Sequence, residues 1–401
     1  MATYKIINDP VYGFITINDS IIFHIIAHPF YQRLRRIHQM ALAYLVYPGA
    51  VHTRLHHSLG AYHLMCNAIT ELKIKGVEIT AEEEVAAKAA ILLHDVGHGP
   101  YSHALENVLL PGIHHEAISL RIMEHLNAEM DGKLQLTIDI FTNKYHKKFL
   151  HQLISGQLDV DRMDYLTRDS FFTGVSEGVI GYDRIIKMLV VCKGELMVAE
   201  KGIYSIEKFL VSRRQMYWQV YLHKTVLSAE KMLKKIVERV KFLMKEDTYL
   251  FLSPSLRYFL QSFNGTLNEE ALLNFLHLDD VDMEYAIKCW SSHPDKVLNT
   301  LCNSLLNRKL LKVKIQATPF SEQEIEQKRK EAQYLYDFSE EEIRYFIFTG
   351  HTENTLYKTG DERINILYKD GSVKDISEIT DPLIHKTVAA QVKKFCICSI
   401  T

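Results

Sequence analysis

A histidine and an aspartate stand side by side, as His94 and Asp95, at the end of an apolar run. Imidazole and carboxylate are the ligand types that suit zinc, iron, manganese or nickel. Two further residues of these types, His57 and Asp161, lie elsewhere in the chain. Two imidazoles and two carboxylates leave open positions on an octahedral ion, where a water molecule or a phosphate oxygen can bind. We therefore predict one divalent transition-metal site (Fe, Mn, Zn or Ni) with the ligands His57, His94, Asp95 and Asp161.

Each of these residues has a simpler explanation when it is taken alone. A single histidine is commonly packed or exposed at the surface, and Asp161 could cap a helix. The metal site is favoured because all four residues occur together, in order and in suitable contexts. If a nucleotide is the substrate, Mg²⁺ on its phosphates is an additional cofactor to expect.

A second group of histidines follows closely, with His98 and His103 in the same run and His115 a little further on. An imidazole can donate a proton to a leaving alkoxide or orient a nucleophilic water. Glu106 lies three residues after His103 and could fix the tautomer of that ring. We predict a catalytic group of His115, His103 and His98 with Glu106. The alternative for His98 and His103 is a purely structural role, such as capping a helix.

A third group is basic and aromatic. Forked guanidinium donors and hydroxyl groups bind phosphate chains. Arg54 lies three residues before His57 and Arg162 directly follows Asp161, so positive charge is placed beside the metal. Tyr217 and Tyr221 have an alternative explanation as a buried aromatic stripe on a helix. The group comprises Arg54, Arg162, Arg213, Tyr165, Tyr217, Tyr221 and Lys224.

These residues need helices to bring them together. Thr80 followed by three glutamates is a helix start, and the helix that ends at His94 should be buried because it is apolar on most sides. Residues 1–20 are expected to form a hairpin-like arm. Further helices are expected at 58–73, 115–130, 146–155, 158–169, 183–191 and 205–246. The last of these would place Arg213, Tyr217, Tyr221 and Lys224 on one face.

The remaining segments are expected to be of mixed type. Residues 195–198 and 202–204 read as a short hairpin, and 254–308 as small amphipathic helices. Residues 309–375 read as strand-rich, with candidates at 312–315, 345–348 and 364–368 and a hairpin turn at 369–372. We therefore expect a helical core over 1–247 and an α+β region over 248–401 that serves oligomerisation or regulation.

Composition narrows the class of protein. The chain has 401 residues, of which 47% are hydrophobic and 24% charged, as in ordinary globular proteins. A net charge of -2 gives no general electrostatic reason for nucleic-acid binding, which is unexpected although not excluded. The six cysteines are expected to be reduced thiols. We expect a cytoplasmic protein, because the first residues lack a signal-peptide pattern and no apolar run reaches about 20 residues.

Residues 6–230 resemble the HD-domain deoxynucleoside triphosphate triphosphohydrolases. The resemblance is carried by an ordered series of motifs rather than by one match. They are Asn8–Gly13, Phe30–Arg35, Tyr47–Ala50, His57–Gly60, the run from His94 to His103, His115–Glu116 and Asp159–Asp169. The resemblance implies a mainly α, multi-helix HD-domain core followed by a smaller α+β C-terminal region.

The resemblance also implies roles for individual residues. His57, His94, Asp95 and Asp161 would hold the metal, His115 would be catalytic, and His98 and His103 would lie near the scissile phosphate. Arg54, Arg162 and Arg213 would hold phosphates, and Tyr165 and Tyr221 would line the sugar and phosphate pocket. Gln39 and Asp169 would contact the 3′-hydroxyl of deoxyribose. In this family water attacks the α-phosphorus and releases a nucleoside and inorganic triphosphate.

One departure from the family concerns regulation. Mammalian members read an activating guanine nucleotide with an acidic residue, and this chain has Ala27 at that position. Arg35, which would face the phosphate of the effector, is retained. The departure speaks against activation of the mammalian kind, although another nucleotide effector could use the same cleft.

We expect metal-dependent hydrolysis of deoxynucleoside triphosphates by a homodimer or homotetramer without a membrane partner. Two other functions stay open. One is hydrolysis of other phosphoesters, either nucleoside monophosphates or cyclic dinucleotides, by the same core. The other is a nucleotide-sensing or nucleic-acid-binding protein without turnover, for which a broken metal set would be the usual sign.

Overall fold

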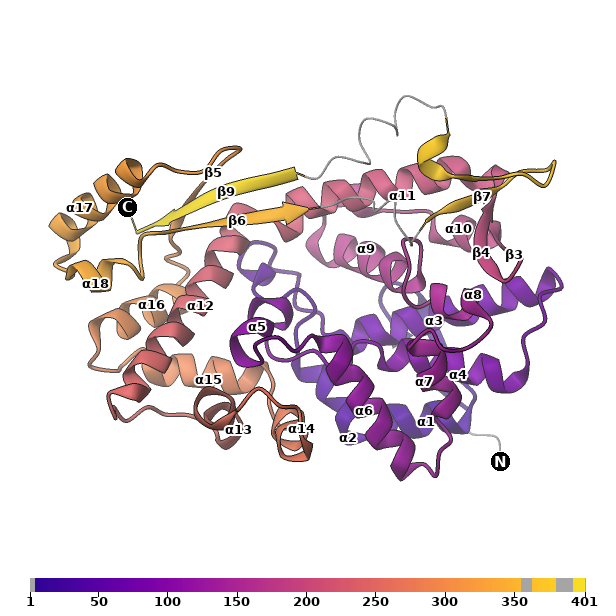
Figure 1. Ribbon diagram of the computed structural model, residues 1–401, viewed down its shortest axis with the longest axis horizontal. Coiled ribbons are helices and arrows are strands. Elements are labelled where there is room, and N and C mark those ends of the chain that lie inside the picture. Colours follow the sequence, from indigo (N-terminus) through magenta and orange to yellow (C-terminus); the bar gives the residue numbers. More distant parts are fainter. Residues whose placement is uncertain (1–3, 355–362, 380–391, 401) are drawn as a thin grey trace.

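The computed structural model describes residues 4–354, 363–379 and 392–400. Helices make up most of this part of the chain, and two small sheets lie along one edge of the helical core (Figure 1). The expected mainly α core with a smaller α+β C-terminal region is confirmed. All six cysteines lie in the described residues, and all are free.

Three helices form the centre of the N-terminal part: α3 (Arg54–Ile74), α4 (Ala81–Leu93) and α9 (Val160–Thr173). The expected start of α4 is correct, because the Thr80 hydroxyl accepts from Glu83 N and the Glu83 carboxylate accepts from Thr80 N. Nearly every residue of α4 after Val85 is buried. His94 and Asp95 therefore leave the end of a rigid, buried helix, as the sequence predicted.

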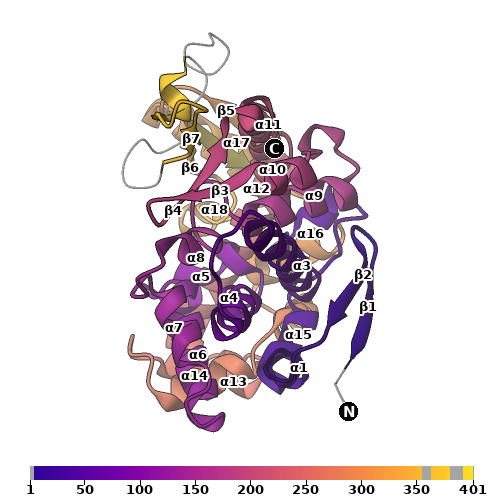
Figure 2. The ribbon, with the colours of Figure 1, turned by 90° about the vertical axis from the view of Figure 1, so that its right-hand side faces the viewer.

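Further helices surround this centre, and all of them except α6 are shorter than the three central helices. Their bounds are α1 (Ser20–Ala27), α2 (Pro29–Gln32), α5 (Glu106–Leu109), α6 (His115–Glu129), α7 (Gln135–Phe141), α8 (Lys148–Gln152) and α10 (Tyr182–Met188). The N-terminal arm is an antiparallel hairpin of β1 (Lys5–Asp9) and β2 (Gly13–Ile17). It lies along the outside of the helical core (Figure 2). The helix expected at 58–73 begins earlier, so Arg54 and His57 lie in the first turn of α3.

The single helix expected over 205–246 is wrong. The chain forms α11 (Ile203–Met216), a π-helical turn over Tyr217–Tyr221, and a separate helix α12 (Lys224–Lys245). The break falls at His223, whose extended backbone and ring nitrogen cap α12 at Thr225 N. Because the π turn changes the angular spacing of residues, the four predicted residues do not share one face. Tyr217 and Tyr221 line one cavity and Lys224 lines another.

The hairpin expected at 195–204 pairs differently. Strand β4 (Glu195–Ala199) runs antiparallel to β3 (Leu189–Cys192), which was expected to be the end of a helix. The turn between them is Lys193-Gly194, and both residues have positive φ. Residues 202–204, expected as the second strand, instead lead into α11.

The C-terminal region begins with small helices, as expected. They are α13 (Pro254–Arg257), α14 (Glu269–Leu276), α15 (Asp280–Trp290) and α16 (Lys296–Leu306). An antiparallel sheet follows in the order β5 (Lys312–Gln316), β9 (Val392–Ser399) and β6 (Phe348–Asn354). The expected strand at 345–348 contributes only its last residue to β6.

The segment expected to be strand-rich also contains two helices, α17 (Glu322–Tyr336) and α18 (Glu340–Ile343). Each begins with a capping box, from Ser321 to Glu324 and from Ser339 to Glu342. The glutamate-, lysine- and glutamine-rich sequence of α17 favours a helix, which is why the strand prediction failed there.

Strands from both parts of the chain join in one mixed sheet. Its order is β3-β4-β7-β8, with β7 (Asn365–Leu367) and β8 (Val373–Asp375) flanking the predicted turn at 369–372. Strand β7 runs parallel to β4, with Val198 opposite Ile366. The division into 1–247 and 248–401 stays a prediction, and this sheet shows that the two parts are structurally interlocked.

Candidate active site

Four predicted metal ligands meet where the first turn of α3, the end of α4 and the first turn of α9 converge. Asp161 Oδ1 lies 3.0 Å from His57 Nε2 and 3.4 Å from His94 Nε2. Asp95 lies 3.5 Å from His57 Nε2 and 3.4 Å from His94 Nε2, through its two carboxylate oxygens. Ligands about 2.1 Å from one ion and at right angles to each other are about 3 Å apart, so this spacing fits a single metal ion.

The two histidines are held with one nitrogen free. His57 Nδ1 is 2.7 Å from Asp164 Oδ2, and His94 Nδ1 is 2.6 Å from the carbonyl oxygen of Ile91. The Nε2 atoms of both rings are buried and make no hydrogen bond with the described residues. A buried polar atom without a partner is costly, and a metal ion would satisfy both atoms. The residues present therefore fit a divalent transition metal.

A buried charge network supports His57 from behind. Asp164 also accepts from Arg168, at 3.0 Å from Nη2, and Arg168 in turn donates to Asp9 at 2.8 Å. The network fits closely against α3, because a Cβ at Gly60 would lie 2.0 Å from Asp164 Oδ1. The glycine is thus required by the approach of α9 to α3.

The turn that carries His94 and Asp95 is fixed against α6. Ser119 Oγ donates to His94 O at 2.7 Å and accepts from Gly97 N at 2.9 Å. A Cβ at Gly97 would lie 2.2 Å from the carbonyl oxygen of His115. Helix α4 ends before Gly97, and the close approach to α6 is what needs glycine here.

Electrostatics keeps the metal-site carboxyl groups ionised. Burial alone would raise the pKa of Asp95, but His94 and Arg54 outweigh it and hold the pKa well below its usual range. The pKa of Asp161 is lowered in the same way, by the adjacent His57 and His94 imidazoles, whose effect outweighs burial. Both side chains are therefore ready to bind a cation at neutral pH.

The second histidine group also comes together. The rings of His98 and His115 stack with their centroids 3.8 Å apart, and His103 meets both rings edge-on. Glu106 accepts from His103 Nδ1 through one oxygen, and from His115 Nδ1 and His115 N through the other, at 2.6–3.0 Å. Burial and the nearby Arg54 lower the pKa of His98 well below its usual value, so this ring is neutral. The neighbouring His114 is exposed and lies 3.9 Å from Glu106.

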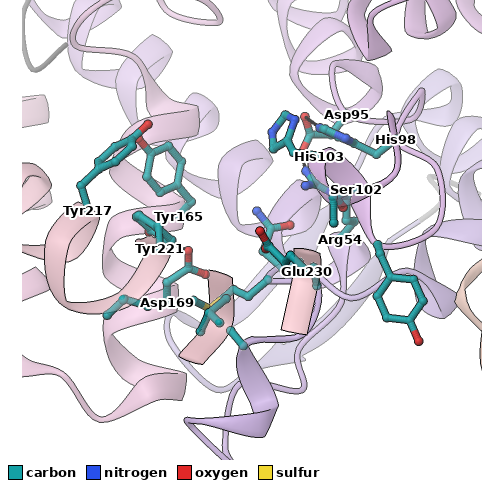
Figure 3. Close-up of a pocket in the computed structure, with 18 of the residues that line it drawn as sticks. Arg54, Asp95, His98, Ser102, His103, Tyr165, Asp169, Tyr217, Tyr221 and Glu230 are labelled. Atoms are coloured by element: carbon teal, nitrogen blue, oxygen red, sulfur yellow. Dashed lines mark hydrogen bonds and ion pairs between the residues drawn. The ribbon is translucent and has the colours of Figure 1, made fainter. Parts of the chain in front are cut away.

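A cavity of about 450 Å³ opens in front of both groups (Figure 3). Five of the predicted residues do not line it, and one of them, Lys224, lines another cavity. His57 and His94 lie behind Asp95 and Asp161, Glu106 lies behind the histidines it holds, and Arg213 is buried against Gln157. The predicted residues that line the cavity are Gln39, Arg54, Asp95, His98, His103, His115, Asp161, Arg162, Tyr165, Asp169, Tyr217 and Tyr221.

Away from the metal, the cavity is bordered by a buried carboxylate. Asp169 accepts from the Tyr221 hydroxyl at 2.8 Å and from His52 Nε2 at 2.7 Å. Gln39 also lines the cavity, and its Oε1 is buried without a hydrogen bond from the described residues. The arrangement offers polar groups of fixed orientation to the hydroxyl groups of a ligand.

The three arginines are held differently. Arg54 pairs with Asp95 through Nη1 and donates from Nε to Ser102 Oγ at 2.9 Å. Arg162 donates from Nε to Gly156 O and Asp159, which leaves its Nη groups for an anion. Arg213 donates from Nη1 to Gln157 at 3.1 Å and lies outside the cavity lining, so the structure does not bring it to the predicted phosphate position.

Several site residues were missed by the sequence reasoning. Asp164 follows the ligand Asp161 by three residues on α9, and that spacing could have suggested a supporting role. Tyr101 and Ser102 line the cavity with positive φ, a strained backbone that no residue-type pattern indicates. Glu230 lines it from α12, and His52 reaches Asp169 from 117 positions away in the chain.

Comparisons with known proteins place this geometry in a family. A family model described as the HD associated region matches residues 180–249. HD domain-containing protein L394 of Acanthamoeba polyphaga mimivirus is 31% identical over 343 residues, which cover 77% of this chain and 72% of that protein. This chain belongs to the HD-domain family.

Two further relatives bear on activity. The crystal structure of a phosphohydrolase from Bacteroides thetaiotaomicron is 49% identical, with a TM-score of 0.94, and covers 99% of this HD-domain chain and 100% of the other. The deoxynucleoside triphosphate triphosphohydrolase SAMHD1 homolog of Dictyostelium discoideum is 32% identical over 248 residues, which cover 57% of this chain and 48% of that protein. These relatives support an HD-type phosphohydrolase, a hydrolase that uses a divalent metal.

The search for membrane spans gave a negative result. Within residues 4–354, 363–379 and 392–400, no helix combines the length and apolar character needed to cross a bilayer.

Proposed function

We propose that this HD-domain protein hydrolyses deoxynucleoside triphosphates to a deoxynucleoside and inorganic triphosphate at a single divalent transition metal. One observation carries the proposal. A single cavity is lined by two metal-site carboxylates, by Arg54 and Arg162, and by the Asp169–Tyr221 pair. Its volume of about 450 Å³ is within the usual range for a ligand pocket, and its polar groups match a phosphate chain and a sugar in turn.

His57, His94, Asp95 and Asp161 would hold the metal ion. When bound there, the ion supplies Lewis acidity beside the reacting phosphorus. The protein contributes a fixed donor set, because Asp164 and Ile91 O orient the two imidazole rings.

The phosphate chain would be bound by Arg162 and by the positively charged Arg54 beside Asp95. The Nε of each guanidinium is already occupied by a protein acceptor, so neither side chain must be ordered when substrate arrives. Such preorganised donors favour charge that develops on phosphoryl oxygens in the transition state.

His115 would supply the proton that the departing 5′-oxygen needs. Glu106 holds its Nδ1, so the Nε2 atom is the end available for proton transfer. The neutral His98 ring stacks on His115 and fixes its plane without adding positive charge. His103 shares Glu106 with His115 and lies at the open side of the same cavity.

The sugar would lie against the Asp169–Tyr221 pair. Gln39 and Asp169 are the groups that we propose for the 3′-hydroxyl of deoxyribose, with Tyr165 and Tyr217 on the same side of the cavity (Figure 3). Arg213 contributes indirectly at most, because it is buried behind the wall against Gln157.

A product assay tests the proposal. Each dNTP is incubated with purified protein and manganese, magnesium, iron or nickel, and products are resolved by anion exchange. We expect nucleoside and intact triphosphate from wild type and from the exposed control His277→Ala, and neither product from the His94→Ala, Asp95→Ala double variant.

Other products would contradict the proposal. Monophosphate with pyrophosphate, or diphosphate with single phosphate, would move the attack to another bond. If no single dNTP reacts, dNTP mixtures test for a nucleotide effector, and inactivity with every mixture would favour a different phosphoester or a sensing role.

A further inference from the structure

Glu230 is an ionisable side chain on the cavity wall that the proposed reaction does not use. It lies on α12, one helical turn after Val226, and both residues line the cavity. Figure 3 shows its carboxyl group facing the same space as Asp169 and Arg54. Within the described part of the chain it forms no hydrogen bond and no close ion pair.

Apolar residues also line this cavity. Met40, Ala41 and Ala43 line the cavity from the segment before α3. Val220 lines it from the π turn, and Leu222 from the position just after that turn. The charged groups that serve the metal and phosphates come from α3, α9 and the turn after α4 instead. An apolar surface with one polar group is the usual form of a site that binds a flat ring and reads its edge.

We propose that Glu230 reads the nucleobase and makes this enzyme prefer guanine. This inference rests on the proposed function, since it assumes that a deoxynucleotide occupies the cavity. A carboxylate has only acceptors, and guanine alone among the four bases presents two adjacent donors, N1–H and the 2-amino group. Adenine places one acceptor (N1) beside its amino group on the matching edge, cytosine places two (N3 and O2), and thymine places two carbonyl oxygens beside its N3–H.

The electrostatics of Glu230 agrees with such a role. Burial raises its pKa to about 7, against the opposing charges of Lys234 and Lys231. An unpaired carboxylate at this depth is stabilised when a ligand donates two hydrogen bonds to it. If a base turned an acceptor toward Glu230, both that acceptor and the buried carboxylate would be left unpaired. Unpaired buried polar groups give a binding site its strongest discrimination between ligands.

The test is the ratio of kcat/KM for dGTP to kcat/KM for dATP at about pH 8.5, where the carboxyl group is ionised. We expect wild type to favour dGTP by about tenfold or more. Glu230→Gln replaces one acceptor with a donor, so the ratio should fall by about tenfold or more. The values of kcat/KM for dATP and dCTP should be retained. The control is Glu238→Gln, which removes the same charge from the exposed face of α12 and should leave the ratio unchanged.

A binding measurement separates the failure of this inference from failure of the proposed function. Analogues of the four dNTPs in which a methylene group replaces the 5′-oxygen are titrated into wild type and Glu230→Gln, because the bond attacked in the proposed reaction cannot be broken in them. If no dNTP is hydrolysed, the proposed function is contradicted. Selective binding of the guanine analogue that is lost in Glu230→Gln would still support the reading of the base by Glu230. Equal affinity for all four analogues, no binding, or a ratio that Glu230→Gln leaves unchanged would overturn the inference.

Discussion

Two carboxylates in this site, Asp164 and Glu106, need not touch the substrate. They act through the histidines that they hold. Asp164 holds His57, a proposed metal ligand, and Glu106 holds His103 and His115. Both act by fixing which ring nitrogen faces the cavity. Their removal should therefore change metal affinity or turnover without removing any group that reacts.

Asp164→Asn should lower metal affinity by about 10–100-fold, because the amide cannot hold the Nδ1–H of His57 as a carboxylate does. Equilibrium competition with a metal-binding dye measures this affinity. Asp9→Asn is the matched control, since Asp9 belongs to the same network but contacts Arg168 rather than His57. Equal affinities in wild type and Asp164→Asn would show that the support is unimportant.

Glu106→Gln should lower kcat by about 10–100-fold and leave KM nearly unchanged. The reason is that one amide cannot accept from both imidazole rings, so His115 loses its fixed orientation. The exposed Glu116→Gln serves as the control, because Glu116 also lies near His115, at 3.5 Å. A loss confined to KM would place Glu106 in substrate binding instead.

The residue types and their order in the sequence were enough to predict which side chains come together at the candidate metal site. They were not enough to predict Arg213, whose position depends on the packing of α11 against the Gln157 loop. His52 and Asp169 show the limit from the other side. Their 2.7 Å contact joins residues 117 positions apart in the chain, so no local sequence pattern predicts it.

At the level of elements, the site depends on how closely α9 approaches α3. Gly60 is the point of approach, where an added Cβ would meet Asp164 and Arg168 at 2.0 and 2.1 Å. No flexible side chain can yield there, because both partners belong to the buried network.

Gly60→Ala should therefore lower the free energy of unfolding by about 1–3 kcal/mol, despite the higher helix propensity of alanine. Urea unfolding measures the change. Gly181→Ala is the control, because no atom of the described residues lies within 4 Å of a Cβ at that position. Stability equal to wild type in Gly60→Ala would mean that the helices can separate without cost.

The sequence predicted those helices best whose ends carry clear signals. Helix α4 has its capping box and an apolar body, and both were recognised. The break between α11 and α12 was missed because Tyr217–His223 contains neither glycine nor proline, so the helical pattern continues through it. The helix α17 was missed because it lies between the candidate strands at 312–315 and 345–348, and a strand-rich segment was expected over 309–375.

Across the whole molecule, the C-terminal region supports the catalytic core. Asp280, at the start of α15, accepts from His38 N and Nδ1 at 2.8 and 2.7 Å and from Tyr101 N at 2.8 Å. Tyr101 and Ser102 have positive φ, and Asp280 helps to hold this strained turn beside the cavity. Residues after 247 thus stabilise the shape of a site whose ligands all come before it.

This contact predicts a pH dependence of stability. The hydrogen bond to Asp280 raises the pKa of His38, although burial opposes it. Because the folded-state pKa lies above the unfolded value of about 6.5, the contribution is fully present below that pH and is lost as pH rises through the raised pKa.

Urea unfolding of wild type and His38→Gln between about pH 6 and pH 9 checks this prediction. The stability difference between them should be largest at the acidic end and shrink as pH rises. A difference that stays constant or grows with pH would show that the charged His38–Asp280 pair does not stabilise the fold.

The most direct test of the central claim is hydrolysis of a dNTP in ¹⁸O-labelled water, with both products examined by mass spectrometry. Attack at the α-phosphorus predicts one labelled oxygen in the released triphosphate and none in the nucleoside. Label in the nucleoside, or label in a monophosphate, pyrophosphate or single phosphate, would contradict the account.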